Sequence, residues 1–360
     1  MTSAVSGLPW HAALTARRGA VAVAVACLML IAAVIASLAI GPVPIAPGRV
    51  AEILLHVLSG DFARDGRDAV VILDVRLPRT LLAICVGAGT AVAGAVMQGL
   101  FRNPLADPGV VGVSSGAGFA AALWFVFGAG LAAGLPYNLG QFGLPLAAFI
   151  GGLTVTLILH MLSRHGGTTQ VMTLLLAGIA IGALAAAGIG FLIFIASDQQ
   201  LRDFTFWTMG SLGGATWIKI AMVLPFAGAF VLIAPRLARG LDALALGEAE
   251  AFHLGIDVES LKRIAIVGVA AAVGASVAVS GVIAFFGLAV PHVVRLAIGP
   301  AHRLLLVVSA IFGGALMITT DLVARTVASP AEVPLGVITS AIGAPFMLWL
   351  LMRQRRYLLV

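Results

Sequence analysis

Charged residues are scarce in this sequence. Of its 360 residues only 10% are Asp, Glu, Lys or Arg, and 61% are hydrophobic. A soluble globular protein carries about 25% charged residues. A chain of this length with so few charges cannot keep its surface wet, so lipid must cover much of it. The composition predicts an integral membrane protein.

Side chains that build catalytic or metal sites are also sparse. Cys27 and Cys85 both lie in apolar stretches, where small side chains pack, and we expect neither a disulfide nor a metal pair from them. The seven histidines are scattered, and none stands at ligand spacing from a cysteine or carboxylate. There is no Walker motif and no catalytic constellation. We therefore expect no catalytic residue, no metal and no cofactor bound by this chain.

Apolar runs, by contrast, are abundant. A membrane helix needs about 20 apolar residues. The first run follows Arg17 and Arg18 and is longer than the apolar region of a signal peptide, about 7–15 residues, so we expect an uncleaved first span. About ten runs are present, near 20–40, 80–100, 110–133, 142–162, 171–196, 215–235, 262–283, 286–298, 303–321 and 335–352.

Basic residues indicate the orientation of these spans. The net charge is +6, but no basic cluster is interleaved with aromatics, so nucleic acid is not an expected partner. If the spans alternate from a cytoplasmic N-terminus, thirteen Lys and Arg fall in inner segments and eight in outer ones. Retention of positive loops in the cytoplasm then predicts that both termini are cytoplasmic. Five of the eight outer residues lie within residues 41–79, a cluster that the rule leaves unexplained.

The sequence also contains an internal repeat. Residues 86–94 (VGAGTAVAG) reappear as 273–281 (VGASVAVSG), and Pro104 matches Pro291 at the same offset of 187 residues. The copies fall in the second and seventh runs, so five spans separate their positions and the copies point in opposite directions. Such inverted repeats are common in transporters. We predict an all-α membrane fold with a single permease domain over residues 1–360, in which spans 2–5 repeat as spans 7–10.

The most polar stretch between apolar runs lies at residues 240–263. It holds five acids and two bases, and Leu246, Glu250 and His253 follow helical spacing. Gly255 is suited to end a helix. A short helix outside the membrane, with a glycine stop and a second short segment, suits the docking of a partner, although a solvated loop is the simpler interpretation.

Two further polar features flank the spans. Residues 101–109 (FRNPLADPG) interrupt two apolar runs, which indicates either a cytoplasmic turn or a structured loop at the mouth of a pathway. Arg76 and Arg79 precede the second span, and Asp321 and Arg325 form an i,i+4 pair near the end of the ninth. These arginines could snorkel at the interface or could meet acids of a partner.

Several ordered motifs together resemble the permease family of iron-siderophore, haem and vitamin B12 ABC importers. The resemblance covers about residues 70–350, and the stretch at 200–207 (QLRDFTFW) is most similar to the haem-importing branch. The motifs are residues 76–80 (RLPRT), 94–98 (GAVMQ), 103–109 (NPLADPG), 112–118 (GVSSGAG), 174–178 (LLLAG), 206–207 with Gly210, 246–248 (LGE) with 254–255 (LG), 285–288 (FFGL) with 291–292 (PH), 321–325 (DLVAR), 332–336 (EVPLG) and 343–345 (GAP).

The resemblance implies a homodimeric permease in a bacterial inner membrane. Two ABC ATPase subunits would bind on the cytoplasmic side and use ATP and Mg, and a periplasmic binding protein would deliver haem or a related iron complex. Residues 240–260 would form the cytoplasmic coupling helices. Motif positions place Gly247, Glu248, Ala251, Leu254 and Gly255 at the ATPase contact, Arg76, Arg79 and Arg325 at the binding protein, and Thr168 and Thr169 at the cytoplasmic gate.

Other classes remain open from the residues alone. The same family transports ferric siderophores and vitamin B12. Outside it, an ion-coupled secondary transporter also has inverted repeats, but it would need ionisable residues near the middle of its spans, where this sequence has almost none. A membrane-embedded enzyme would need a polar catalytic cluster within the bilayer. We therefore predict a permease for haem or a similar complex, working by alternating access.

Overall fold

Helices make up almost the whole of this computed structural model, which describes residues 9–59, 66–132, 140–166 and 168–358. Seven helical segments in that part of the chain are long and apolar enough to cross a membrane. They are α1 (Pro9–Ala39), the continuous run of α3 (Arg67–Val70), η1 (Val71–Arg76) and α4 (Leu77–Leu100), then α7 (Gly143–Leu162), α8 (Val171–Ile195), α10 (Trp217–Leu244), α12 (Val258–Ser280) and α14 (His302–Thr326).

Three further helices contain shorter apolar stretches, at Val113–Gly128, Phe286–Ile298 and Leu335–Leu350. They are α5 (Val113–Ala132), α13 (Phe286–Ile298) and α15 (Leu335–Leu358), and α5 is preceded by the 3-10 turn η2 (Pro108–Val111). Taken in chain order, the long and short apolar helices coincide with the ten runs expected from the sequence. The prediction of a many-span, all-α membrane fold is confirmed.

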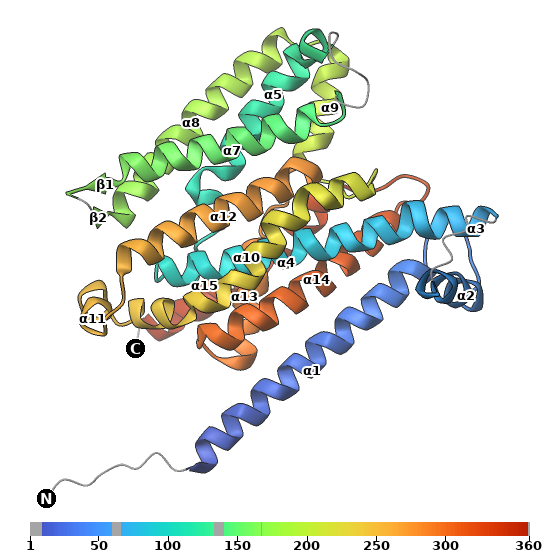
Figure 1. The fold of residues 1–360 in the computed structure, drawn as a ribbon. Coiled ribbons are helices and arrows are strands. Elements are labelled where there is room, and N and C mark those ends of the chain that lie inside the picture. Colours follow the sequence, from blue (N-terminus) through green and yellow to red (C-terminus); the bar gives the residue numbers. More distant parts are fainter. Residues whose placement is uncertain (1–8, 60–65, 133–139, 167, 359–360) are drawn as a thin grey trace, which may run out of the picture.

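The remaining elements lie at the two ends of the bundle. In Figure 1 the short helices α2 (Pro47–Leu58), α3 and α9 (Asp198–Thr208) lie at one end. The opposite end holds α11 (Glu248–His253), the two-stranded hairpin of β1 (Arg164–His165) and β2 (Thr168–Thr169), and the ends of α1 and α15 that lead to the two termini. We call these the α9 end and the α11 end.

Helix α4 occupies the centre of the molecule, where it packs against α14, α10, α12 and α13. Glycines allow this close packing. A Cβ built at Gly87 would lie 2.5 Å from the carbonyl oxygen of Gly313, so the backbones of α4 and α14 touch there. Gly116 of α5 and Gly151 of α7 meet in the same way. Helices in lipid associate through such small residues because the hydrophobic effect does not drive them together.

The two halves of the chain pack into one another. Figure 1 shows α4 beginning at the α9 end and α12 beginning at the α11 end, so the two helices run in opposite directions. Helix α4 packs against α14 and α13 of the second half, while α12 packs against α7 and α5 of the first half. The first helix of each repeat, α4 or α12, thus packs against helices of the other repeat. An inverted repeat of spans 2–5 and 7–10 produces this arrangement.

The residue-by-residue match at offset 187 does not extend to helix boundaries. Residues 86–94 lie in the middle of α4, whereas α12 ends at Ser280, and Gly281 adopts a φ of 69° that ends the helix. Pro104 lies in the loop after α4, while Pro291 lies inside α13. Backbone groups at and beside the end of α12 find partners within the protein, as a membrane requires. Ser211 donates its N–H to the carbonyl oxygen of Ser280 at 2.7 Å, and Leu335 donates to Gly210 at 2.9 Å.

Candidate functional site

The polar segment at residues 240–260 folds as the end of α10, the short helix α11 and the start of α12. Gly247 precedes α11 with a φ of 139°, and Gly255 follows it with a φ of 79°. Both angles lie where residues with a side chain are strained, so these two glycines set the bounds of the helix. Asp257 caps α12 by accepting a hydrogen bond from the N–H of Ser260, and that bond lowers the pKa of its carboxyl.

Helix α11 is anchored on one face and bare on the other. Ala251 is fully buried, and the helix packs against the ends of α10 and α12. Leu246 before the helix, Phe252 within it and Leu254 just after it are about two-thirds exposed, at 69%, 71% and 63%. We call these three residues the apolar face of α11. Exposed apolar groups clustered within a polar segment mark an interaction site. Of the residues that the motifs placed at the ATPase contact, Leu254 belongs to this apolar face, whereas Ala251 is buried against the bundle. Their role in partner contact stays a prediction.

A buried lysine lies directly behind α11. The side chain of Lys262 is 2% exposed, and its ammonium donates to Glu248 of α11 at 2.8 Å and to the carbonyl oxygen of Thr169 at 2.8 Å. Glu259 lies 3.4 Å from the same ammonium. The carboxylate of Glu259 in turn accepts the N–H of Thr169 at 3.0 Å and its hydroxyl at 2.9 Å. We call Lys262, Glu248, Glu259 and Thr169 the lysine cluster.

The two residues predicted at the cytoplasmic gate form β2 of the hairpin between α7 and α8. Thr169 is buried by the lysine cluster, whereas Thr168 is exposed and pairs with His165 across the hairpin. The structure therefore brings the predicted gate residues and the predicted coupling residues to the same end of the molecule. Their role in gating stays a prediction.

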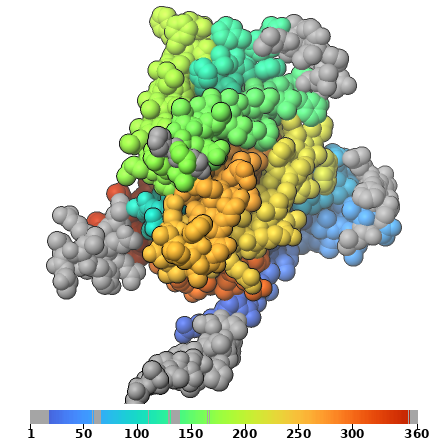
Figure 2. Space-filling model, turned by 60° about the vertical axis from the view of Figure 1, so that its left-hand side comes forward, coloured from blue at the N-terminus to red at the C-terminus, as the bar shows by residue number. Residues whose placement is uncertain are grey.

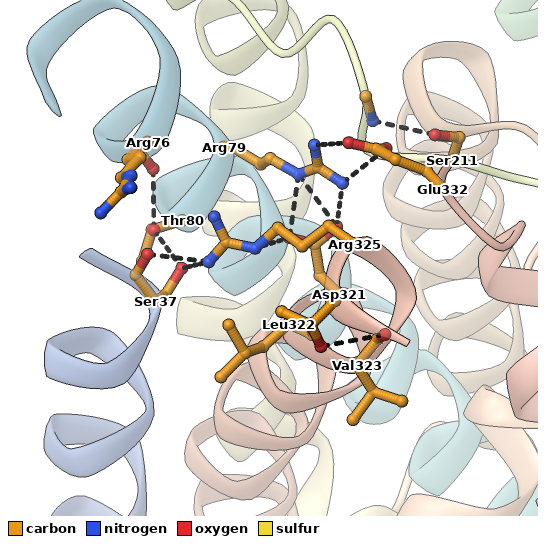
Figure 3. A network of polar contacts seen from close by, with 12 residues as sticks. Ser37, Arg76, Arg79, Thr80, Ser211, Asp321, Leu322, Val323, Arg325 and Glu332 are labelled. Carbon is orange, nitrogen blue, oxygen red and sulfur yellow. Dashed lines mark hydrogen bonds and ion pairs between the residues drawn. The ribbon is translucent and has the colours of Figure 1, made fainter. Parts of the chain in front are cut away.

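Arg79 lies inside the protein at the α9 end (Figure 3). Its guanidinium donates through Nε to Asp321 of α14 at 2.9 Å and through Nη1 to Glu332 at 2.7 Å. Asp321 is 2% exposed. Glu332 lies in the connection between α14 and α15, and its hydrogen bond with Arg79 lowers the pKa of its carboxyl. A buried charge is tolerated when it is paired and hydrogen-bonded in this way.

Arg325 and Arg76 extend the same network to α1. Arg325 donates to the carbonyl oxygen of Ser37 at 2.7 Å and to its hydroxyl at 2.9 Å, and Ser37 is bonded to Thr80 of α4 at 2.8 Å. Arg76 donates to the carbonyl oxygens of Leu38 at 2.6 Å and Ala39 at 2.9 Å, and also to Val43. These arginines therefore fasten the end of α1 to α4 and α14.

This geometry does not present the three arginines to a partner. Arg76, Arg79 and Arg325 are 3%, 8% and 4% exposed, and each guanidinium is engaged inside the chain. Docking of a binding protein onto them stays a prediction that would require the network to open. Among the residues that the structure describes at this end, Arg67 and Arg202 are exposed and Arg49 is half-exposed, and Arg49 pairs with Glu52 at 2.8 Å, whereas Arg64 lies outside the described residues. Arg49 and Arg67 belong to the outer cluster that the topology argument left unexplained.

Sequence reasoning missed the central members of both networks. In the sequence, Lys262 contributes to the positive charge of an inner segment, and that assignment did not predict that it would be buried. The available signal was a lysine three residues after Glu259, inside the first turns of an apolar helix, where a charge needs a partner. Glu332 was noticed only as part of a motif. The pairing of Asp321 with Arg79 spans 242 residues, which no local spacing indicates.

Nothing in the described ranges 9–59, 66–132, 140–166 and 168–358 groups three His, Cys, Asp or Glu side chains around a possible metal ion. Cys27 and Cys85 are free thiols.

Comparison with known proteins gives a consistent result. Residues 29–353 match the model of the FecCD transport family. The chain is 47% identical over 285 residues to the hemin transport system permease protein of Yersinia pestis, covering 79% of this chain and 83% of that protein. It is 43% identical over 284 residues to the cobalamin import system permease protein of Halobacterium salinarum, covering 78% and 73%. Identity to a vitamin B12 import system permease protein of Escherichia coli is 38% over 291 residues, covering 81% and 86%.

A solved structure shares the fold. It is described as an inward-facing conformation of a metal-chelate type ABC transporter, and it superposes with a TM-score of 0.77 at 31% identity. The match covers 92% of this chain and 98% of that chain. The likeness therefore extends over nearly the whole of both chains.

Proposed function

This chain belongs to the FecCD transport family, and from that premise we propose that it carries haem. It is the permease subunit of an ATP-binding-cassette importer for haem or a related substrate. The higher identity to the hemin permease, 47% against 43% and 38% for the cobalamin and vitamin B12 permeases, favours haem. The family context implies an ATPase and a substrate-binding protein as partners, and ATP with Mg would be used by that ATPase.

The observation that carries the coupling to ATP is the apolar face of α11. Leu246, Phe252 and Leu254 project from a segment held outside the spans, and Ala251 fixes the helix on the bundle. We assign this face to the ATPase contact, with Gly247 and Gly255 setting the bounds of α11 and Glu248 linking it to the bundle. The hairpin with Thr168 and Thr169 would be the cytoplasmic gate at the same end.

The arrangement of the ends supports the orientation. The first residues of α1 and the last residues of α15 lie at the α11 end of the molecule (Figure 1). If α11 meets a cytoplasmic ATPase, both termini are cytoplasmic in the bacterial inner membrane, and the α9 end faces the binding protein. The excess of Lys and Arg in the corresponding segments points the same way.

A homodimer is the assembly that we propose for the pathway. Helix α8 packs against α5 and α7, and its remaining surface exposes Leu176, Ile179, Leu184 and Phe194. In a bilayer such a face can be covered by lipid or by a second copy. The mass of the purified permease in lipid nanodiscs, measured by light scattering, would be that of two chains. A single-chain mass would contradict the proposal.

The ATPase contact can be tested by single substitutions on α11. Phe252→Glu and Leu254→Glu should remove co-purification of the ATPase, because each places a charge in an apolar contact. Leu201→Glu on α9, at the opposite end, is the matched control. Retained ATPase binding in both α11 variants would overturn the assignment.

The substrate is best tested through the whole importer. Proteoliposomes with permease, ATPase and binding protein would be supplied in turn with haem, a ferric siderophore and vitamin B12. We expect ATP-dependent uptake of haem. Uptake of vitamin B12 or siderophore without haem would keep the importer assignment and overturn the substrate. Uptake driven by an ion gradient without ATP would instead support a secondary transporter.

A further inference from the structure

Lys262 is among the largest fully buried side chains of the protein. An ammonium group has three protons to donate. Here three acceptors surround it, namely Glu248 of α11, Glu259 of α12 and the carbonyl oxygen of Thr169 in β2. One side chain therefore connects three separate elements at the α11 end.

The hairpin depends on this cluster for its position. Its strands pair through only two residue pairs, Arg164 with Thr169 and His165 with Thr168. An isolated two-stranded hairpin is marginally stable. Thr169 is held on both sides, since Glu259 accepts its N–H and Lys262 donates to its carbonyl oxygen. The start of α12 therefore helps to hold the hairpin in place, together with the strand pairing and the short links to α7 and α8.

Helix α11 is attached to the same point from the other side. It is bounded by two glycines with positive φ, and Glu248 in its first turn reaches back to Lys262. A displacement of α11 moves the Glu248 carboxylate relative to Lys262. If the buried lysine follows Glu248, its bond with Thr169 is altered. If it stays in place, it loses one of its two carboxylates and keeps only Glu259 to balance its charge.

The elements that Lys262 connects adjoin one another on the surface (Figure 2). The hairpin region (green) lies against α12 (orange) on the face that also carries α11. The flexible stem and compact ammonium of lysine suit a group that must change acceptors as its surroundings move. An arginine would form a more rigid planar contact.

We propose that Lys262 is a positioning residue that transmits movement of α11 to the hairpin containing Thr168 and Thr169. This inference rests on the proposed function, in which α11 is the ATPase contact and the hairpin is the gate. Lys262 does not touch the substrate. It sets how much transport results from each ATP that the partner hydrolyses.

The test uses the complete importer in proteoliposomes, with ATP hydrolysis and uptake measured in the same vesicles. Lys262→Met should leave hydrolysis in place and lower the uptake per ATP on the order of tenfold, a typical coupling between sites. Glu248→Gln weakens the α11 contact and Glu259→Gln weakens the hairpin contact, because each removes a negative charge beside Lys262, and both should shift the ratio in the same direction. Lys262→Arg should restore part of it.

Arg263→Met is the matched control, because Arg263 is the next residue, has the same charge and is exposed. Its ratio should equal that of the unaltered protein. A second readout follows the hairpin directly. In a background with Cys27→Ala and Cys85→Ala, Thr168→Cys should react with an impermeant maleimide at a rate that depends on nucleotide, and Lys262→Met should abolish that dependence.

Each result is decisive. An uptake-to-hydrolysis ratio and a labelling pattern unchanged by Lys262→Met would overturn the proposal. If that variant does not fold, unchanged ratios in both Glu248→Gln and Glu259→Gln would overturn it equally. Absence of ATP-driven uptake in the unaltered importer would instead reject the proposed function, whatever the variants do.

Discussion

Arg79 and Asp321 form a two-bond contact in the interior, with Nε 2.9 Å from Oδ2 and Nη2 2.9 Å from Oδ1. The residues belong to α4 and α14, the helices whose backbones touch at Gly87 and Gly313. Helices α4 and α14 are therefore joined twice, by the glycine contact within the bundle and by this ion pair nearer the α9 end. Substitutions at these two residues can measure how much the ion pair contributes to the stability of the protein.

Asp321→Asn should destabilise the protein strongly. The change leaves the buried guanidinium of Arg79 with Glu332 alone and removes the acid beside Arg325, and breaking a buried pair costs about 3–5 kcal/mol. Thermal unfolding in detergent measures the loss. Glu52→Gln, which breaks an exposed pair, should leave the transition where it is. The double variant Arg79→Met with Asp321→Leu should recover stability relative to Asp321→Asn, and a double variant that is less stable would contradict this account.

The Arg79–Glu332 contact should make stability depend on pH. The hydrogen bond from Arg79 lowers the pKa of Glu332 in the folded protein. A carboxyl with a depressed folded-state pKa contributes stability above its unfolded-state pKa, and this contribution is lost as pH falls through the folded-state pKa. The difference in melting temperature between the unaltered protein and Glu332→Gln should thus be largest at neutral pH and shrink as the medium is made acidic. A difference that grows on acidification would refute the assignment.

Gly87→Ala should destabilise the bundle, because the added Cβ would lie 2.5 Å from the carbonyl oxygen of Gly313. Forcing one methyl group into a packed contact costs about 1–3 kcal/mol. Gly182→Ala in α8 is the control, since a Cβ there meets nothing within 4 Å. That substitution should be neutral or stabilising by up to about 1 kcal/mol, because alanine favours helix over glycine. Equal melting temperatures for the two variants would exclude the close contact.

Exposed arginines at the α9 end should influence capture of the binding protein. Arg202→Glu on α9 should slow association, most clearly at low salt, since surface charges steer encounter rates and ions screen them. Surface plasmon resonance with the permease in nanodiscs measures the rate, and the melting temperature should not change. Arg325→Glu should instead lower the melting temperature, because its side chain is buried. A stable Arg325→Glu protein with weakened docking would restore the role predicted from its motif.

The spans and the acidic helix could be predicted because each depends on residues close in the sequence. Apolar runs of sufficient length specify helices in lipid, and Gly255 ends α11 where the pattern indicated. The contacts of the candidate site could not be predicted as fully from the sequence. Motifs placed Glu248 and Thr169 at one end of the protein, but only the fold brings Lys262 between them. For Arg79 the motif gave the position and not the burial, because Asp321 and Glu332 arrive from the other half of the chain.

The long separation of Arg79 from its acids has a consequence for synthesis of the protein. Asp321 follows Arg79 by 242 residues, so the ribosome delivers the arginine long before the carboxylate that neutralises it. Until α14 is inserted, the start of α4 carries a cation with no internal partner and has to remain near the lipid headgroups. Completion of the second half would then draw that end of α4 into place. We therefore expect the ion pair that joins α4 to α14 to form only after the second half of the permease has been made.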